Sequence, residues 1–185
     1  MVPLTSLVLP ILLSAVFVFI ASSLLHMVLQ YHRSDYTPLP DEDKVVSALR
    51  SAGLKPALYV FPHCTPKEMK SPAMQEKYKQ GPVGLLTVFP SGLPNMPKFL
   101  GMWFGYCLVI SFFAAYLTGR TVLHGAPYLA VFRVAGTATF FAYGLGPLVN
   151  GVWRGVPWSS VLKESFDGLI YSLVTAGTFG WLWPR

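Results

Sequence analysis

The chain has 185 residues, of which 53% are hydrophobic and only 12% are charged, and its formal net charge is +6. This composition, with its positive mean hydropathy, argues against a water-soluble globular protein. The positive charge does not indicate nucleic-acid binding, because basic and acidic residues are mixed and no basic face carries aromatic base readers. The lipid bilayer is therefore the expected surrounding of the chain.

Four segments are long and apolar enough to cross a membrane. They cover residues 4–29, 99–117, 126–148 and 166–183. A helix of about 20 residues crosses about 30 Å of hydrocarbon, and the segments lack the two-residue alternation of barrel strands. The first has no Lys or Arg before it and exceeds a signal-peptide core, so we expect a retained anchor. The sequence thus predicts an all-α membrane protein with four transmembrane helices in a single integral membrane domain, residues 1–185.

The distribution of basic residues predicts how these helices are oriented. Four spans place both termini on one side of the membrane and the long loop, residues 30–98, on the other. Lys and Arg are more numerous in this loop and in the connection over 149–164 than on the opposite side. By the positive-inside rule, the long loop is predicted to be cytoplasmic and both termini periplasmic.

The long loop carries local signals for helices. The stretch PDEDKVVSALRSAG has acidic residues in its first turn, an apolar face and a glycine near its end, which predicts a short helix at the membrane surface. TPKE predicts a capping box between Thr65 and Glu68, and SPAMQEKYKQG predicts a second helix start at Ser71 and an end at Gly81, so that one bent helix or two short ones would fit. The prolines of GPVGLLTVFPSGLPNMPKF argue against a continuous helix or a central strand, so this stretch is expected along the membrane interface. The loop is therefore predicted to be structured and partly helical.

Small residues recur at four-residue spacing in three of the predicted spans, which lets helices approach closely. These residues are Gly101 and Gly105 in the second span, Ala138, Ala142 and Gly146 in the third, and Gly168, Ser172, Ala176 and Gly180 in the fourth. The stripes fit packing inside the bundle, which we favour, or packing against a second copy or another integral membrane subunit. The expected partners are therefore membrane lipids and, in the alternative, other membrane subunits.

Arg133 interrupts the apolar stretch YLAVFRVAGTATFFAYG. In the interpretation that we favour, Arg133 extends towards the outer interface and bonds carbonyl groups or lipid phosphates. In the alternative, it faces the bundle interior as an anchor for a lipid headgroup or a small anion, and Asp167 and Tyr171 extend an inner polar cluster. A direct pair between Arg133 and Asp167 is disfavoured, because the predicted spans place the two residues at different depths.

Histidine and cysteine provide weak candidates for a metal site. His26 and His32 flank the inner end of the first span, and His63 and Cys64 are adjacent in the loop. Imidazole and thiolate groups bind metals, but this spacing matches no metal motif, so we predict no metal and no other cofactor. Cys64 and Cys107 are not expected to form a disulfide. No nucleophile with an identifiable base is present, so no catalytic residue is predicted and an enzyme is the less favoured class.

Four stretches spread over nearly the whole chain carry a resemblance to known proteins. They are YHRSDYTPLPDEDKVVSALRSAG, KYKQGPVGLLTVFPSG, APYLAVFRVAGTA and DGLIYSLVTAGTFGWLWP. In these stretches the chain resembles a group of small bacterial four-helix inner-membrane proteins of unknown function. The resemblance implies a bacterial inner-membrane location and one unit over the whole chain, and it assigns no binding or catalytic residue.

These observations lead to two main functional hypotheses. The favoured one is an accessory or scaffold subunit of a bacterial inner-membrane complex, because the chain combines small-residue stripes and a structured loop with no recognisable catalytic group. The alternative is a membrane protein that binds or transports a lipid or a small anion through Arg133. A metal or redox protein that uses the histidines or Cys64 is a third and less favoured class.

Overall fold

The computed structural model describes residues 1–185 and divides the chain into two compact units. The helical unit comprises Met1–Tyr36 and Asn95–Arg185, and the loop unit comprises Thr37–Pro94. Residues 30–36 of the predicted long loop therefore belong to the helical unit. The predicted spans thus fall in the helical unit, and most of the predicted long loop forms the loop unit.

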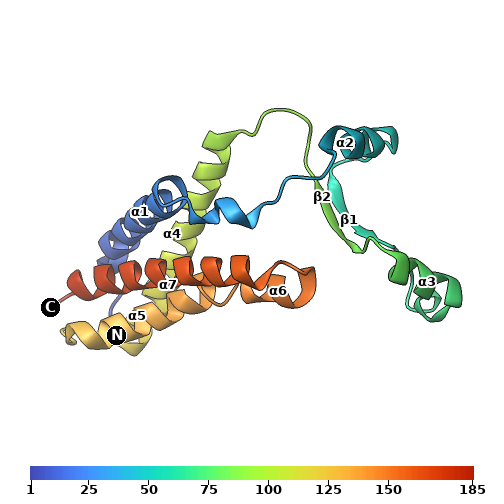
Figure 1. The fold of residues 1–185 in the computed structure, drawn as a ribbon. Helices are drawn as coiled ribbons and strands as arrows, with labels where there is room; N and C mark the ends of the chain where they lie inside the picture. Colours follow the sequence, from blue (N-terminus) through green and yellow to red (C-terminus); the bar gives the residue numbers. More distant parts are fainter. The chain divides into compact units, whose positions relative to one another are not determined.

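The helical unit contains four long helices and four shorter helical segments (Figure 1). They are η1 (Leu4–Leu7), α1 (Val8–Ser23), η2 (Leu24–Val28), η3 (Tyr31–Asp35), α4 (Met96–Thr121), α5 (Tyr128–Tyr143), α6 (Leu148–Arg154) and α7 (Trp158–Trp181). Three helical stretches are long and apolar enough to cross a membrane. These are Leu4–Val28, Met96–Thr121 and Tyr128–Arg154. The helical membrane character predicted from the sequence is therefore confirmed for three segments, and the fourth predicted segment, 166–183, falls mostly in α7.

Both chain termini lie at the same end of the helical unit, beside the connection between α4 and α5. The backbone N–H of Val2 donates a hydrogen bond to the carbonyl of Gly119 at 2.8 Å, and the N–H of Gly125 donates to the carbonyl of Pro184 at 3.0 Å. Figure 1 shows the two termini at this end of the bundle. The helices α1, α4, α5 and α7 consequently run between the same two ends of the unit.

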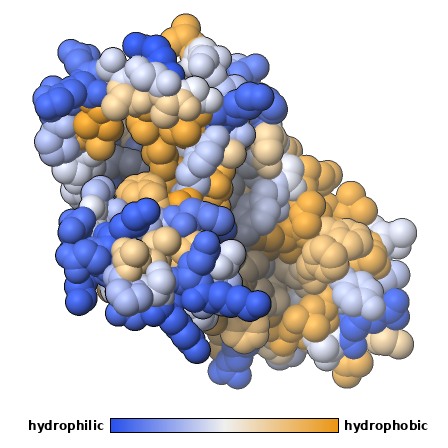
Figure 2. Space-filling view, turned by 90° about the vertical axis from the view of Figure 1, so that its right-hand side faces the viewer, coloured by the Kyte–Doolittle hydropathy of each residue, from blue (hydrophilic) through white to orange (hydrophobic).

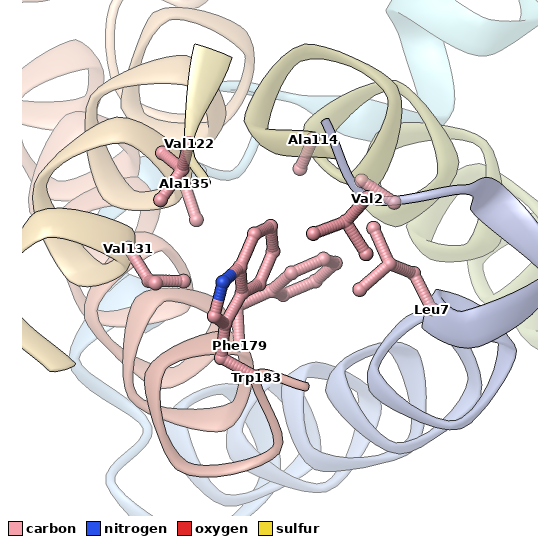
Figure 3. Packing of buried hydrophobic residues seen from close by; sticks show 9 residues of the cluster. Val2, Leu7, Ala114, Val122, Val131, Ala135, Phe179 and Trp183 are labelled. Carbon is pink, nitrogen blue, oxygen red and sulfur yellow. The ribbon is translucent and has the colours of Figure 1, made fainter. Parts of the chain in front are cut away.

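A hydrophobic core forms at the end of the bundle that holds the termini. Phe179 and Trp183 of the C-terminal segment lie among apolar side chains from other parts of the helical unit (Figure 3). These side chains include Val2, Leu7, Ala114, Val122, Val131 and Ala135. Phe179 and Leu7 are both fully buried, so this core fixes the last turns of α7 against the first residues of the chain.

The helices α5 and α7 are in very close contact, and small residues make this possible. A Cβ atom at Gly168 would lie 2.3 Å from the carbonyl oxygen of Tyr143, and one at Gly180 would lie 2.6 Å from the ring of Tyr128. The predicted stripe over Gly168, Ser172, Ala176 and Gly180 thus packs inside the chain. In contrast, no atom lies within 4 Å of a Cβ atom built at Gly101 or Gly105.

The outer surface of the helical unit carries many large apolar side chains. Among those exposed on the long helices are Leu12, Ile20, Val109, Phe113, Leu117, Leu129 and Phe141. Figure 2 shows hydrophobic side chains covering continuous areas of one face of the molecule. Exposed apolar areas of this kind are unusual in water and are expected where helices contact lipid.

The loop unit contains two helices that the sequence predicts well. They are α2 (Glu42–Ser51) and α3 (Pro72–Gln80), with a short turn, η4 (Glu68–Lys70), between them. The capping box is present, because the backbone N–H of Thr65 donates to the Glu68 carboxylate at 2.7 Å. The hydroxyl of Ser71 accepts a hydrogen bond from the N–H of Met74 at the start of α3. Local capping chemistry therefore explains where these segments begin.

The loop unit also contains a small antiparallel sheet, so the all-α prediction is wrong for this part of the chain. Strand β1 (Ala57–Phe61) pairs with β2 (Gly84–Val88) in a register that sets Ala57 opposite Val88 and Phe61 opposite Gly84. The prolines at positions 82 and 90 flank β2 and do not interrupt it. Because a proline outside the paired stretch removes no ladder hydrogen bond, the strand can form.

Candidate functional site

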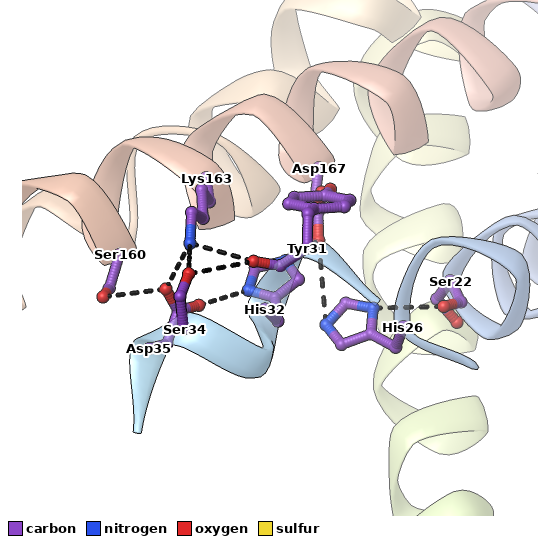
Figure 4. Close-up of polar contacts among 9 residues, drawn as sticks. All are labelled: Ser22, His26, Tyr31, His32, Ser34, Asp35, Ser160, Lys163 and Asp167. Carbon is purple, nitrogen blue, oxygen red and sulfur yellow. Dashed lines mark hydrogen bonds and ion pairs between the residues drawn. The ribbon is translucent and has the colours of Figure 1, made fainter. Parts of the chain in front are cut away.

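Two histidines meet where the chain leaves α1. The helix ends in a π-helical turn, η2, which carries His26, and Gln30 then adopts a left-handed backbone conformation with φ of 51°. This reversal starts η3 and brings His32 back over His26. The two imidazole rings stack with centroids 4.6 Å apart and planes inclined by 9°. Figure 4 shows both rings beside Asp167 of α7.

His32 lies between two carboxylates. Its Nδ1 atom contacts Asp35 Oδ2, and its Nε2 atom lies 2.9 Å from Asp167 Oδ2. Asp35 also accepts hydrogen bonds from Lys163 Nζ at 2.7 Å and from the Ser160 hydroxyl at 3.0 Å. These contacts tie the short helix η3 to α7, as Figure 4 shows.

The surroundings of Asp35 keep its carboxylate ionised. Partial burial raises the pKa of Asp35, but the hydrogen bonds from Lys163, His32 and Ser160 lower it by more, so the pKa lies below the ordinary value of 3.8. An ionised Asp35 can only accept hydrogen bonds. The Nδ1 atom of His32 therefore carries a proton and donates a hydrogen bond to Asp35.

His26 completes the cluster. Its Nδ1 atom lies 3.1 Å from the carbonyl oxygen of Ser22, one turn earlier in α1, and its Nε2 atom lies 3.7 Å from Asp167 Oδ2. The side chain of His26 is 52% exposed, whereas that of Asp167 is only 4% exposed. The cluster thus joins a nearly buried carboxylate to an accessible imidazole.

A cavity of about 680 Å³ adjoins this cluster, between α1, α4, α7 and the segment that joins α5 to α6. His26 and Asp167 form part of its wall, together with Ser22 and Asn150. Four aromatic side chains form much of the remainder. These are Trp103, Tyr106, Tyr143 and Tyr171. A cavity of this size and predominantly apolar wall falls within the range that holds small ligands in proteins.

Three buried polar atoms at the cavity have no hydrogen-bond partner within the chain. They are the hydroxyls of Tyr143 and Tyr171 and the Oδ1 atom of Asp167. The two tyrosine rings pack edge to face with centroids 5.6 Å apart. Because an unsatisfied buried polar group costs about 1–3 kcal/mol, these atoms favour a bound species that can hydrogen-bond to them.

The structure brings together only part of the polar cluster proposed from the sequence. Asp167 and Tyr171 both line the cavity, but Arg133 is exposed on α5 and is not part of its wall. The inward-facing Arg133 of the alternative hypothesis is therefore not observed. Asp167 instead contacts His32 and His26.

The four weak metal candidates separate into two pairs. His26 and His32 join Asp167 in one cluster. His63 and Cys64 belong to the loop unit, where the Cys64 sulfur lies 3.8 Å from the Tyr78 hydroxyl. Cys107 is buried in α4, and both cysteines are free.

Sequence reasoning missed Asp35 and the aromatic wall. The stretch HRSD places His32 and Asp35 three residues apart, a spacing that brings them together on a helical turn, so a local signal for this contact exists. The indole N–H of Trp103 donates to the Ser22 hydroxyl at 2.8 Å beside the cavity. Nothing in the spacing of the aromatic residues indicates that they converge.

Comparison of the chain with protein-family models, with curated proteins and with solved structures finds no match. The three apolar helices are compatible with a multi-pass membrane protein.

Proposed function

We propose that this chain is a bacterial inner-membrane protein with four spanning helices that binds an amphiphilic, lipid-soluble molecule in the cavity beside Asp167. The observation that carries this proposal is the aromatic cavity with its three unpartnered polar atoms. A ligand that matches both features has an apolar body and a polar head. The head accepts hydrogen bonds from the hydroxyls of Tyr143 and Tyr171, which can both donate, and it donates one to Asp167 Oδ1, which accepts. Asp167 and Tyr171 replace Arg133 as the ligand-binding residues of this proposal.

The proposal takes α7 as the fourth spanning helix. Its 24 residues suffice to cross the bilayer, and much of its surface is buried against other helices rather than exposed to lipid. Two of its buried hydroxyls are satisfied locally: Ser172 donates to the carbonyl of Gly168 at 2.6 Å, and Thr175 donates to that of Tyr171 at 2.9 Å. A central helix can therefore be less apolar than its neighbours. Both termini lie at the same end of the helical unit, which requires an even number of crossings and therefore agrees with four.

Labelling with a membrane-impermeant maleimide tests this topology. Both natural cysteines are replaced by serine, and single cysteines are introduced as Ser91→Cys in the loop unit or Arg185→Cys at the C-terminus, both exposed positions. With four spans and a cytoplasmic loop, Arg185→Cys reacts in intact spheroplasts and Ser91→Cys reacts only after lysis. If both positions react from the same side, α7 does not cross the membrane.

Native mass spectrometry of the protein in a mild detergent tests ligand binding. We expect a retained small molecule in the wild-type protein, weaker retention in Tyr171→Phe, which removes one hydroxyl, and none in Ala142→Trp, which fills part of the cavity. Tyr116→Phe is the matched control, because Tyr116 is an exposed tyrosine of α4 outside the cavity wall. Equal retention by Ala142→Trp and Tyr116→Phe would contradict the proposal.

A second candidate function is that of an accessory or scaffold subunit. It is favoured by the face of α4 around Gly101 and Gly105. The two glycines have the spacing of a close contact between membrane helices, but no atom of the chain lies within 4 Å of a Cβ built at either position. The same native mass spectra distinguish this function, since a stoichiometric second protein that dissociates in Gly105→Leu supports it. A monomeric chain at all detergent concentrations contradicts it.

A further inference from the structure

The contact between the two histidines and Asp167 raises a question of charge. A potential ligand atom of each of His26, His32 and Asp167 lies within 4.8 Å of the others. The three residues come from η2, η3 and α7, so the fold, and not a local sequence motif, assembles the cluster. His32 Nε2 and His26 Nε2 lie 2.9 Å and 3.7 Å from the same oxygen, Asp167 Oδ2.

The other nitrogen of each imidazole is already committed as a donor. The Nδ1 atom of His26 faces the carbonyl of Ser22 at 3.1 Å, and a carbonyl oxygen can only accept. The Nδ1 atom of His32 faces the carboxylate of Asp35, which accepts its hydrogen bond. In the neutral rings both protons therefore reside on Nδ1, and both Nε2 atoms carry a lone pair.

Two lone pairs and a carboxylate oxygen cannot face one another without a positive charge between them. A proton on His32 Nε2 can supply that charge, and so can a metal ion. The arrangement around the two rings is typical of a metal site. Metal-binding histidines commonly donate their remaining N–H to a carboxylate or a backbone carbonyl, which fixes the tautomer and the ring orientation. Both kinds of partner are present here, Asp35 for His32 and Ser22 for His26.

We propose that His26 Nε2, His32 Nε2 and a carboxylate oxygen of Asp167 form a binding site for a divalent transition-metal ion such as Zn²⁺. Two imidazoles and one carboxylate favour Zn²⁺ or Fe²⁺ over Mg²⁺ or Ca²⁺, which prefer oxygen ligands. His26 and Asp167 also form part of the cavity wall, so a further coordination position faces the cavity. The metal site does not require the proposed amphiphile, because all three ligand atoms come from the chain itself.

The geometry requires only small movements to receive such an ion. Ligand atoms bound at about 2.0–2.1 Å in a tetrahedral site lie roughly 3.3 Å apart, which falls between the two observed separations of 2.9 Å and 3.7 Å. The stacked rings tilt towards the ion so that their lone pairs converge. The ring of His26 has room to tilt, because its side chain is 52% exposed.

Titration calorimetry of the full chain with ZnCl₂ tests the site, after treatment with a chelator and in one detergent. We expect about one Zn²⁺ per wild-type chain and at least a tenfold loss of affinity in His26→Ala. Asp35→Asn, which alters a partner of His32 and no metal ligand, is expected to lose about 10–100-fold. His124→Ala is the matched control, because His124 is an exposed histidine of the same unit outside the cluster.

Binding of Co²⁺ provides a second readout that does not rely on affinity. The wild-type protein and His124→Ala should develop visible d–d absorption bands with Co²⁺, and His26→Ala should not. Circular dichroism checks that His26→Ala is folded. The proposal is overturned if the wild-type chain binds no stoichiometric Zn²⁺, which leaves a proton as the cation of the cluster. It is also overturned if His26→Ala binds Zn²⁺ as tightly as His124→Ala does.

Discussion

Replacing Gly168 by alanine should destabilise the chain, although alanine is the better helix former. A Cβ atom at this position would lie 2.3 Å from the carbonyl oxygen of Tyr143 and 2.5 Å from the Cα atom of Gly144. Both are backbone atoms, which cannot rotate away. Relief of the overlap to an ordinary separation requires α5 and α7 to move apart by about 1 Å, and such a gap forfeits roughly a quarter to a half of each dispersion contact across the interface.

The expected magnitude follows from two opposing contributions. Overpacking of a tight interface costs about 1–3 kcal/mol, and the change from glycine to alanine inside a helix gains about 1 kcal/mol. The free energy of unfolding should therefore fall by about 1 kcal/mol, within a range of about 0–2 kcal/mol. In a chain of this length the melting temperature should fall by on the order of 4 °C.

Two control variants isolate the effect of the contact. Gly177→Ala lies on the same helix, where the nearest atom to the new Cβ is the Tyr128 hydroxyl at an ordinary 3.6 Å. Gly101→Ala lies on α4, where nothing is within 4 Å. Scanning fluorimetry in one detergent should show both controls melting at or above the wild-type temperature. If Gly168→Ala melts with Gly177→Ala, the close contact between α5 and α7 does not exist as described.

Three further predictions concern the core, the loop unit and the link between η3 and α7. Phe179→Ala should lower the free energy of unfolding by about 3–5 kcal/mol, because Phe179 is fully buried, and the same fluorimetric assay measures this loss. The hydrogen bonds from the Thr65 backbone and hydroxyl hold the pKa of Glu68 below its ordinary value of 4.5; the contact is therefore present at neutral pH and lost as the pH falls through that lowered pKa. The NMR shift of the Thr65 amide should titrate below pH 4.5 in the wild type and should not titrate in Glu68→Gln. Asp35→Asn removes a charge that Lys163 contacts, so hydrogen exchange at neutral pH should become faster over residues 31–36. The wild type should lose the contact between Asp35 and Lys163 only as the pH falls through the Asp35 pKa, which lies below 3.8.

The helices of this chain could be predicted where local chemistry determines them. Length and hydropathy locate three membrane-length stretches, and capping residues locate α2 and α3. The strands are harder to predict, because prolines 82 and 90 lie close to β2, although partly buried and exposed residues alternate along GLLTV. Proline excludes pairing only at its own backbone nitrogen, and neither proline lies within the paired stretch.

The candidate site depends on long-range contacts and was correspondingly harder to predict. His32 and Asp167 are 135 positions apart in the sequence, and no spacing rule connects a residue after the first helix with one near the start of the last. The contact between His32 and Asp35, three residues apart, is within reach of a helical spacing rule. The sequence therefore indicates the contact between His32 and Asp35 more readily than the contact between His32 and Asp167.

Arg133 and Asp167 show why a charge in an apolar stretch does not by itself locate a site. Arg133 attracts notice because its neighbours in the sequence are apolar, but its long side chain lies on an exposed surface, where it can reach an interface. Asp167 has a short side chain that is 4% exposed, so its charge has to be compensated by groups that the fold brings to it. Those groups come from the segment that leads from α1 to residue 36, the last residue before the loop unit. The polar cluster thus holds residues 31–36, where the chain leaves the helical unit, against α7. A change of charge at Asp167 therefore alters the contacts that hold these residues.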